Sequence, residues 1–219
     1  MAMQIGDSDM VGRECERARE DFRPEHIEWL LVIEARPRSL DRFFYFTGSS
    51  ENDGLFLETT RAVLGNDDLR VKNLRYRKEE HLEKLRSAGF YLIEAVETPV
   101  NRSMPIGKRK ARVLESMPSL IARIRGLDAE GCKVILVGSP VYQLRHHLRR
   151  EGITVQNDCM IPFPSSGHQK EFREQLRRML GTNLKSEACP RADTKVSVQC
   201  SGEARSCFVG VLAEPLPDL

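Results

Sequence analysis

The amino-acid sequence predicts an α/β fold in which a mainly parallel sheet of four strands lies between layers of helices. Two observations support this three-layer α/β/α prediction. Four short apolar runs are typical of buried strands, and amphipathic helical segments separate consecutive runs. Strands joined through helices usually form a parallel sheet with right-handed crossovers. The chain has 219 residues, enough for one such domain with a full core and an extension.

The first strand and the loop after it come before every other predicted strand and carry the densest set of functional candidates. Residues 29–34 form an apolar run that ends on a carboxylate, Glu34. The following loop presents two arginines and three aromatic residues: Arg36, Arg38, Phe43, Phe44 and Tyr45. Because ligands of open α/β sheets bind beyond the carboxyl ends of the strands, this loop is expected at the edge of a site.

The remaining elements follow in chain order. Strands are predicted at 90–101, 132–138 and 152–158, and helices at 11–22, 53–65, 79–89, 108–127, 140–150 and 170–181. Gly89 is expected to end its helix in the left-handed conformation, and Pro118 to kink or divide the helix around it. Pro140 suits the first turn of its helix.

These elements predict three parts: an N-terminal helical lead-in at 1–27, an α/β domain at 28–181, and a C-terminal extension at 182–219. The extension is polar and patternless, which predicts partial disorder, although two short runs in it could pair as a hairpin.

Composition narrows the class of protein. The chain is 40% hydrophobic and 30% charged, as in soluble globular proteins, and has no apolar run approaching the roughly 20 residues that span a bilayer. Its first residues lack the apolar core of a signal peptide, so we expect a cytoplasmic protein without a membrane partner.

Six cysteines without zinc-ligand spacing are expected to be reduced thiols. The net charge of +2 makes no case for nucleic acid, although basic clusters occur at 107–112, 144–150 and 170–178; each could equally be a solvated helix face.

Each candidate site residue has an ordinary interpretation beside the functional one. Glu34 is either a strand end that faces water or a group that activates water and stabilises a cation. The three aromatics either pack in the core or leave at least one ring free to stack on a base. In the loop 161–169, Ser165, Ser166 and Gly167 precede a helix. They either bind an anion such as phosphate or provide a plain N-cap through Ser166. His168 is the histidine best placed for chemistry.

Taken together and in this order, these loops resemble the uracil-DNA glycosylase superfamily over roughly residues 28–180, and most closely its iron–sulfur branch. VIEARP keeps the acidic position of the first family motif at Glu34, and NRSMP keeps Asn101 and Arg102 of the middle segment. VILVG is similar to the apolar third strand that ends in glycine, and FPSSG supplies the proline and serine of the last motif at Pro164 and Ser165.

The sequence also departs from the family pattern. Phe163 occupies the histidine position of the last motif, and the four cysteine ligands of the iron–sulfur cluster are not reproduced. The asparagine that reads uracil falls near Glu94 here. An ionised carboxylate only accepts hydrogen bonds, so it suits an amino-bearing base such as a modified cytosine better than uracil.

The resemblance implies a monomeric DNA glycosylase that flips out a damaged or modified base and hydrolyses its N-glycosidic bond, without a metal or organic cofactor. It implies that Glu34 activates water, that His168 assists the leaving base, and that the remaining candidates bind DNA. Those for the base are Phe43, Phe44, Glu94 and Asn101, and those for phosphates are Arg36, Arg102, Ser165, Ser166 and Gly167. One alternative is a non-catalytic DNA-binding protein with this fold, which Phe163 favours. Another is an unrelated hydrolase or nucleotide-binding protein, for which the chain has no Walker, G-x-G-x-x-G or G-x-S-x-G motif.

Overall fold

The computed structural model describes residues 4–48, 53–65, 76–101, 103–127, 131–165 and 167–181. Contacts divide the chain into two units, residues 1–187 and 188–219, and all described residues belong to the first unit. The predicted lead-in at 1–27 falls in that same unit, and the predicted extension at 182–219 lies outside the described residues. Within the described part, no helix has the length and apolar character needed to cross a bilayer.

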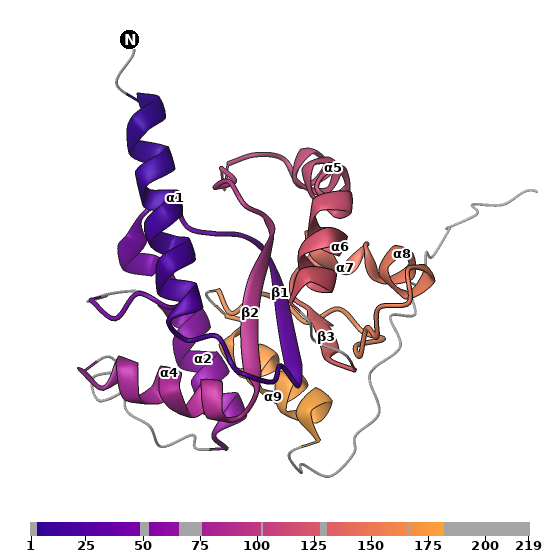
Figure 1. Ribbon diagram of the computed structural model, residues 1–219. Coiled ribbons are helices and arrows are strands. Elements are labelled where there is room, and N and C mark those ends of the chain that lie inside the picture. Colours follow the sequence, from indigo (N-terminus) through magenta and orange to yellow (C-terminus); the bar gives the residue numbers. More distant parts are fainter. Residues whose placement is uncertain are drawn as a thin grey trace, which may run out of the picture. The chain divides into compact units, whose positions relative to one another are not determined.

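A parallel sheet of three strands forms the centre of the described residues. The strands are β1 (Trp29–Ala35), β2 (Phe90–Val96) and β3 (Lys133–Leu136), in the order β2-β1-β3. Trp29 lies opposite Phe90 on one side and Lys133 on the other, so the three strands begin at the same level, and β3 ends opposite Val32, three residues before the end of β1. They run upward in Figure 1. Because β1 is central, its apolar residues 30–33 are fully or almost fully buried.

The predicted fourth strand, 152–158, is reduced to isolated bridges. Val155 pairs with Val134, and Ile161 pairs with Val137 just beyond the end of β3. Between these bridges the fully buried side chain of Asn157 replaces backbone pairing. Its Oδ1 accepts a hydrogen bond from the Leu136 amide at 2.9 Å, and its Nδ2 donates to the Leu136 carbonyl at 3.0 Å. The described residues therefore form an α/β fold with three strands where the sequence predicted four.

The helices follow the predicted order, with shifted bounds. They are α1 (Gln4–Glu20), α2 (Gly54–Val63), α4 (Lys78–Ser87), α5 (Ile106–Glu115), α6 (Met117–Gly126), α7 (Ser139–Tyr142), α8 (Arg145–Arg150) and α9 (Gln169–Leu180). A short 3-10 helix, η1 (Leu40–Arg42), precedes the aromatic triplet. The predicted helix 140–150 is two helices, α7 and α8. Helix α1 starts seven residues earlier than predicted and lies next to β2 (Figure 1).

Glycine and proline act as the sequence predicted. Pro118 lies in the first turn of α6 and marks the division between α5 and α6, because proline lacks the N–H that a continuous helix would need. Gly89 has a φ of 66° and ends the α4 segment immediately before β2. An added Cβ there would lie only 3.1 Å from backbone atoms of residues 26 and 28, so both the turn and the close packing require glycine.

Tyr45 and α1 protect the outer edge of β2. The Tyr45 hydroxyl accepts a hydrogen bond from the Leu92 amide at 2.7 Å and donates to the Leu92 carbonyl at 3.2 Å. On the same side, the Tyr91 hydroxyl lies 3.1 Å from Oε1 of Glu20, the last residue of α1. All seven residues of β2 are consequently buried although β2 is an edge strand.

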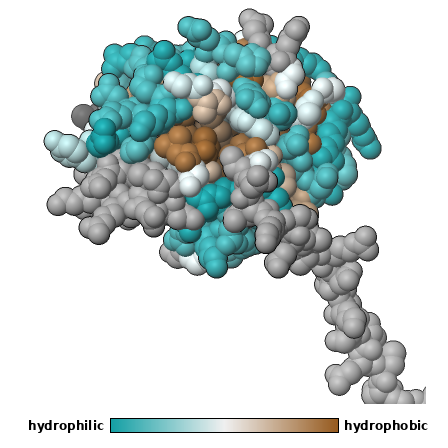
Figure 2. Space-filling model, turned by 90° about the horizontal axis from the view of Figure 1, so that it is seen from below, coloured by the Kyte–Doolittle hydropathy of each residue, from teal (hydrophilic) through white to brown (hydrophobic). Residues whose placement is uncertain are grey.

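The surface that faces downward in Figure 1, where the strands begin, is largely hydrophilic with a small hydrophobic patch near its centre (Figure 2). The cysteines differ from the prediction of reduced thiols. Cys159 is disulfide-bonded, whereas Cys15 and Cys132, the other cysteines of the described residues, are free and buried.

Candidate functional site

Three loops with predicted site residues leave the sheet at its carboxyl edge. The loop after β1 starts at Arg36, the loop after β2 covers residues 97–105, and residues 162–168 follow the bridge between Ile161 and Val137. The Val137 amide also donates to the Val32 carbonyl at 2.9 Å, which ties the start of the third loop to β1. The topology therefore brings the starts of the three loops to the edge where open α/β sheets bind ligands.

Glu34 lies at this edge and forms an ion pair with Arg109 of α5. The guanidinium contacts both carboxylate oxygens. Its Nε lies 2.8 Å from Oε1, and its Nη2 pairs with Oε2. The side chains are 14% and 29% exposed for Glu34 and Arg109, respectively, so solvent reaches the pair. Hydrogen bonding to Glu34 raises the pKa of Arg109. The pair holds the carboxylate in one orientation, with lone pairs still available on both oxygens.

Arginines also connect the strand ends to each other. Arg36 is 7% exposed, and its Nε donates to the Glu97 carbonyl at 3.1 Å, which joins the ends of β1 and β2. Arg112 of α5 donates from Nη2 to the Thr98 hydroxyl at 2.6 Å and holds the start of the 97–105 loop. The predicted phosphate contact by Arg36 is not met in this structure, because its side chain is buried and bonded to the protein.

The aromatic triplet is part of the core. Phe43, Phe44 and Tyr45 are 0%, 4% and 3% exposed, and the rings of Phe44 and Tyr45 pack edge to face with centroids 4.9 Å apart. The buried ammonium group of Lys78 fixes the segment by donating to the Phe43 carbonyl at 3.2 Å. The expectation that at least one ring is free to stack on a base is therefore wrong here. Phe43 and Phe44 are buried in the apolar core, and Tyr45 is also hydrogen-bonded to the edge of β2.

Glu94 is separated from Glu34 by the sheet itself. Glu94 is the register partner of Ile33, and neighbouring side chains of a strand point to opposite faces, so Glu34 and Glu94 leave the sheet on opposite faces. Glu94 is 1% exposed, and its Oε2 lies 2.5 Å from Nη2 of Arg19 on α1. Burial raises the pKa of Glu94, and the Arg19 charge opposes that shift. The predicted contact of Glu94 with a base is not possible in this arrangement.

Asn101 remains available at the surface of the 97–105 loop. Its Oδ1 accepts a hydrogen bond from the Ser103 amide at 3.1 Å, which leaves the Nδ2 group to donate elsewhere. Its neighbour Arg102, predicted as a phosphate ligand, lies outside the described residues.

The 162–168 loop shows ordinary turn hydrogen bonds. The Ser165 amide donates to the Phe163 carbonyl at 2.7 Å, and the Gly167 amide donates to the side chain of Gln169 at 3.0 Å. His168 caps α9 through its backbone position, and its ring Nδ1 lies 3.2 Å from a carboxylate oxygen of Glu171. Ser166 lies outside the described residues. Within the described part, no hydrogen bond or ion pair joins this loop to Glu34.

Arg109 is the site residue that sequence reasoning did not single out. It belongs to the basic segment 107–112, which the sequence shows directly after the strand-end loop 97–105. That placement was the available signal, because a helix that follows a strand-end loop begins at the carboxyl edge. Lys108 on the same helix is exposed, so α5 presents a positive charge beside the Glu34–Arg109 pair.

The arrangement can hold an anionic ligand near an oriented carboxylate. A carboxylate there can accept a proton from water or stabilise a developing positive charge. Among the described residues, no group of three or more His, Cys, Asp or Glu side chains is placed to hold a metal ion. Comparison of the chain with protein-family models, curated proteins and solved structures finds no match.

Proposed function

We propose that the protein is a DNA N-glycosylase that hydrolyses the bond between a flipped-out base and its sugar at the carboxyl edge of the sheet. The observation that supports this best is the common starting edge of the loops after β1, after β2 and after Ile161. These loops carry the motifs that resemble the uracil-DNA glycosylase superfamily. The four-stranded, three-layer form of that fold is part of the proposal.

In this mechanism Glu34 orients the attacking water and stabilises the cation that develops on the sugar as the bond to the base breaks. Because Arg109 binds both carboxylate oxygens, Glu34 is held in one position before substrate arrives. A pre-oriented carboxylate pays little reorganisation cost when the cation forms, which is the usual source of electrostatic catalysis. His168, at the exposed start of α9, is the proposed donor to the leaving base.

DNA would bind across the loops and α5. Lys108 provides an exposed charge for a phosphate, and Ser165 and Gly167 provide a polar turn beside α9. Phosphate contacts of this kind supply affinity and position without reading sequence.

Base recognition differs from the one predicted from sequence. The preference for an amino-bearing base such as a modified cytosine depended on Glu94, which is buried against Arg19 on the other face. The exposed Asn101 has a free amide donor, so the proposed contact is with a carbonyl oxygen of the base.

A cleavage assay at abasic sites tests this proposal. Duplexes that contain uracil, hypoxanthine or modified cytosine are incubated with the wild type and with Glu34→Gln, and strand breaks are counted after alkali. We expect base release by the wild type and a loss of at least about 100-fold in Glu34→Gln, since general-base catalysis contributes on that scale. Glu115→Gln, at an exposed position of α5, is the matched control and should retain activity.

A second candidate is a non-catalytic DNA-binding protein with the same fold. The Glu34–Arg109 ion pair favours it, because the guanidinium already contacts both carboxylate oxygens that would otherwise bind the attacking water. Absence of base release from every duplex, with duplex binding retained by the wild type and by Glu34→Gln, would select this candidate. In either case Lys108→Gln should reduce the salt dependence of binding by about one released counterion.

A further inference from the structure

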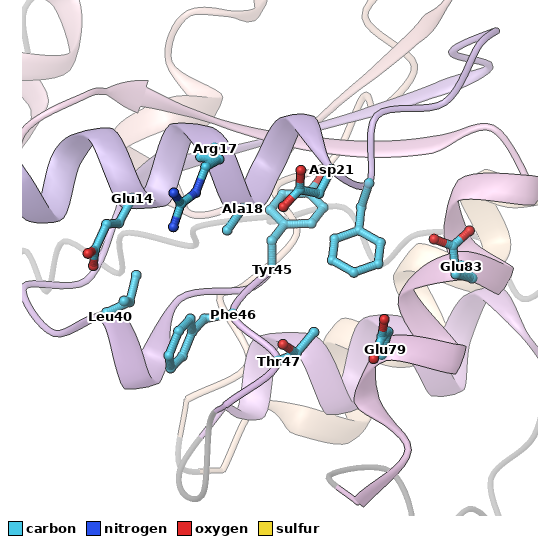
Figure 3. Close-up of a pocket in the computed structure, with 11 residues that line it drawn as sticks. Glu14, Arg17, Ala18, Asp21, Leu40, Tyr45, Phe46, Thr47, Glu79 and Glu83 are labelled. Atoms are coloured by element: carbon cyan, nitrogen blue, oxygen red, sulfur yellow. The ribbon is translucent and has the colours of Figure 1, made fainter.

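A groove separate from the proposed site lies between α1, residues 40–47 and the first turns of α4. Its volume is about 630 Å³, within the range of pockets that hold small molecules. Figure 3 shows that it is enclosed by α1 on one side, by the segment from Leu40 to Thr47 below, and by α4 at one end. Of the candidate residues named from the sequence, Tyr45 lines this groove.

The floor of the groove is apolar and rigid. It consists of Phe22, Leu40, Tyr45 and Phe46. The rings of Phe22 and Tyr45 are stacked, with centroids 6.3 Å apart and planes 12° from parallel. Tyr45 cannot move away easily, because its hydroxyl is bonded to the edge of β2. Phe22 and Tyr45 are only 8% and 3% exposed, so an alkyl chain would cover the partly exposed side chains of Leu40 and Phe46.

The rim of the groove is strongly acidic. Four carboxylates line it, from Glu14, Asp21, Glu79 and Glu83, against one cation, Arg17. Within the described residues, Glu83 pairs with Arg86, while the side chains of the other three acids form no hydrogen bond or ion pair. With Arg17 and the Arg86 that pairs with Glu83 counted, the rim has a net charge of about −2 in a protein whose total charge is +2. This sign excludes phosphate-bearing ligands and favours a multiply charged cation.

The spacing of the carboxylates favours a linear ligand. Glu79 and Glu83 are four residues apart on α4, which places their Cβ atoms about 5–6 Å apart on one face. Glu14 and Asp21 are seven residues apart along α1 and its final turn, or about 10 Å along the helix axis. Negative groups therefore follow one long side of the groove along α1 and also line the end formed by α4 (Figure 3).

We propose that this groove binds a linear aliphatic polyamine. Its methylene segments would cover Leu40 and the ring of Phe46, and its ammonium groups would pair with the carboxylates of α1 and α4. A protonated amine near an aromatic face also gains a cation–π attraction. The site is independent of the proposed glycosylase function.

Isothermal titration of the full-length protein with spermidine at low ionic strength tests the proposal, with a diol of matched length as the uncharged control. Spermidine should bind with one-to-one stoichiometry, and the diol should not. Glu79→Gln should weaken binding about threefold, the effect of one unit charge about 6 Å away in water. Arg17→Gln should strengthen binding by a similar factor, because it removes the opposing charge.

Two further variants separate the groove from general attraction to acidic side chains. Phe46→Ser should weaken binding about fourfold for each methylene that it uncovers. Glu115→Gln, an exposed acid on α5 outside the groove, should leave binding unchanged. Thermal melting of each variant checks that the fold is retained.

Three results would overturn the proposal. They are absence of spermidine binding to the wild type, equal weakening by Glu79→Gln and Glu115→Gln, and binding of a tetralysine peptide without binding of spermidine. The last result would assign the groove to a basic protein segment instead.

Discussion

Replacing Arg19 by methionine tests whether the contact between α1 and the sheet is a buried ion pair. The side chains of Arg19 and Glu94 are 14% and 2% exposed, and Glu94 Oε1 has no hydrogen-bond partner. The Glu94 charge thus depends on Arg19. Removing one partner of a buried pair costs about 3–5 kcal/mol, because the other charge stays buried without compensation. With a urea m value of about 2 kcal/mol per molar, the unfolding midpoint of Arg19→Met should fall by about 1.5–2.5 M at pH 7.

The pH dependence of that loss gives a second readout. Burial raises the folded-state pKa of Glu94, so the folded protein binds this proton more tightly than the unfolded chain. This difference in proton binding stabilises the folded protein at pH values below the ordinary carboxyl pKa. The stabilisation is lost as the pH rises through the raised pKa of Glu94. Without Arg19 the pKa rises further, and the penalty of Arg19→Met should therefore shrink as the pH is lowered toward about 4.5.

Arg125→Met is the matched control, since Arg125 pairs with Glu151 at 2.9 Å where the side chains are 59% and 48% exposed. Such a surface pair contributes at most about 1 kcal/mol. Urea titrations followed by circular dichroism at both pH values compare the two variants. Equal midpoints for Arg19→Met and Arg125→Met, or a penalty of Arg19→Met that does not change with pH, would refute the reasoning.

Three further substitutions test other parts of the fold by thermal or urea unfolding. Tyr45→Phe leaves an amide and a carbonyl at the β2 edge without their partner and should cost about 1–3 kcal/mol, whereas equal stability would mean that water replaces the hydroxyl. Asn157→Ala leaves the amide and the carbonyl of Leu136 at the edge of β3 without their partner, so it should lower the free energy of unfolding by a similar amount. Gly89→Ala should destabilise more than Gly152→Ala. Both glycines have a positive φ, but only at Gly89 would the new Cβ meet backbone atoms at 3.1 Å.

The sequence was sufficient to predict the features that depend on residues close together in the chain. The apolar run at 29–34 became β1, the left-handed Gly89 ended α4, and Pro118 separated α5 from α6. Each of these outcomes depends on sterics or on missing N–H groups within a few residues. They set the order of the strands and helices, and they placed Glu34 at a strand end.

The contacts of the polar and aromatic side chains could not be predicted in the same way, because they depend on partners far along the chain. Tyr45 was predicted near a ligand, but it pairs with Leu92, which lies 47 residues away. Asn157 fills the place of a fourth strand because its amide matches the backbone donor and acceptor of Leu136. A single sequence shows neither relationship, because both depend on which strand edge is left open after the sheet has formed.

The two glutamates near the strand ends show how the fold separates structural from functional candidates. Both are paired with an arginine from a distant helix, so the presence of an ion pair does not distinguish them. Exposure does. Glu94 is enclosed with Arg19, and opening that pair would leave a buried charge. Glu34 is 14% exposed beside a 29% exposed Arg109, so a phosphate can compete for the guanidinium while the carboxylate stays solvated. The chemistry that we propose for this edge of the sheet is therefore assigned to the face that carries Glu34.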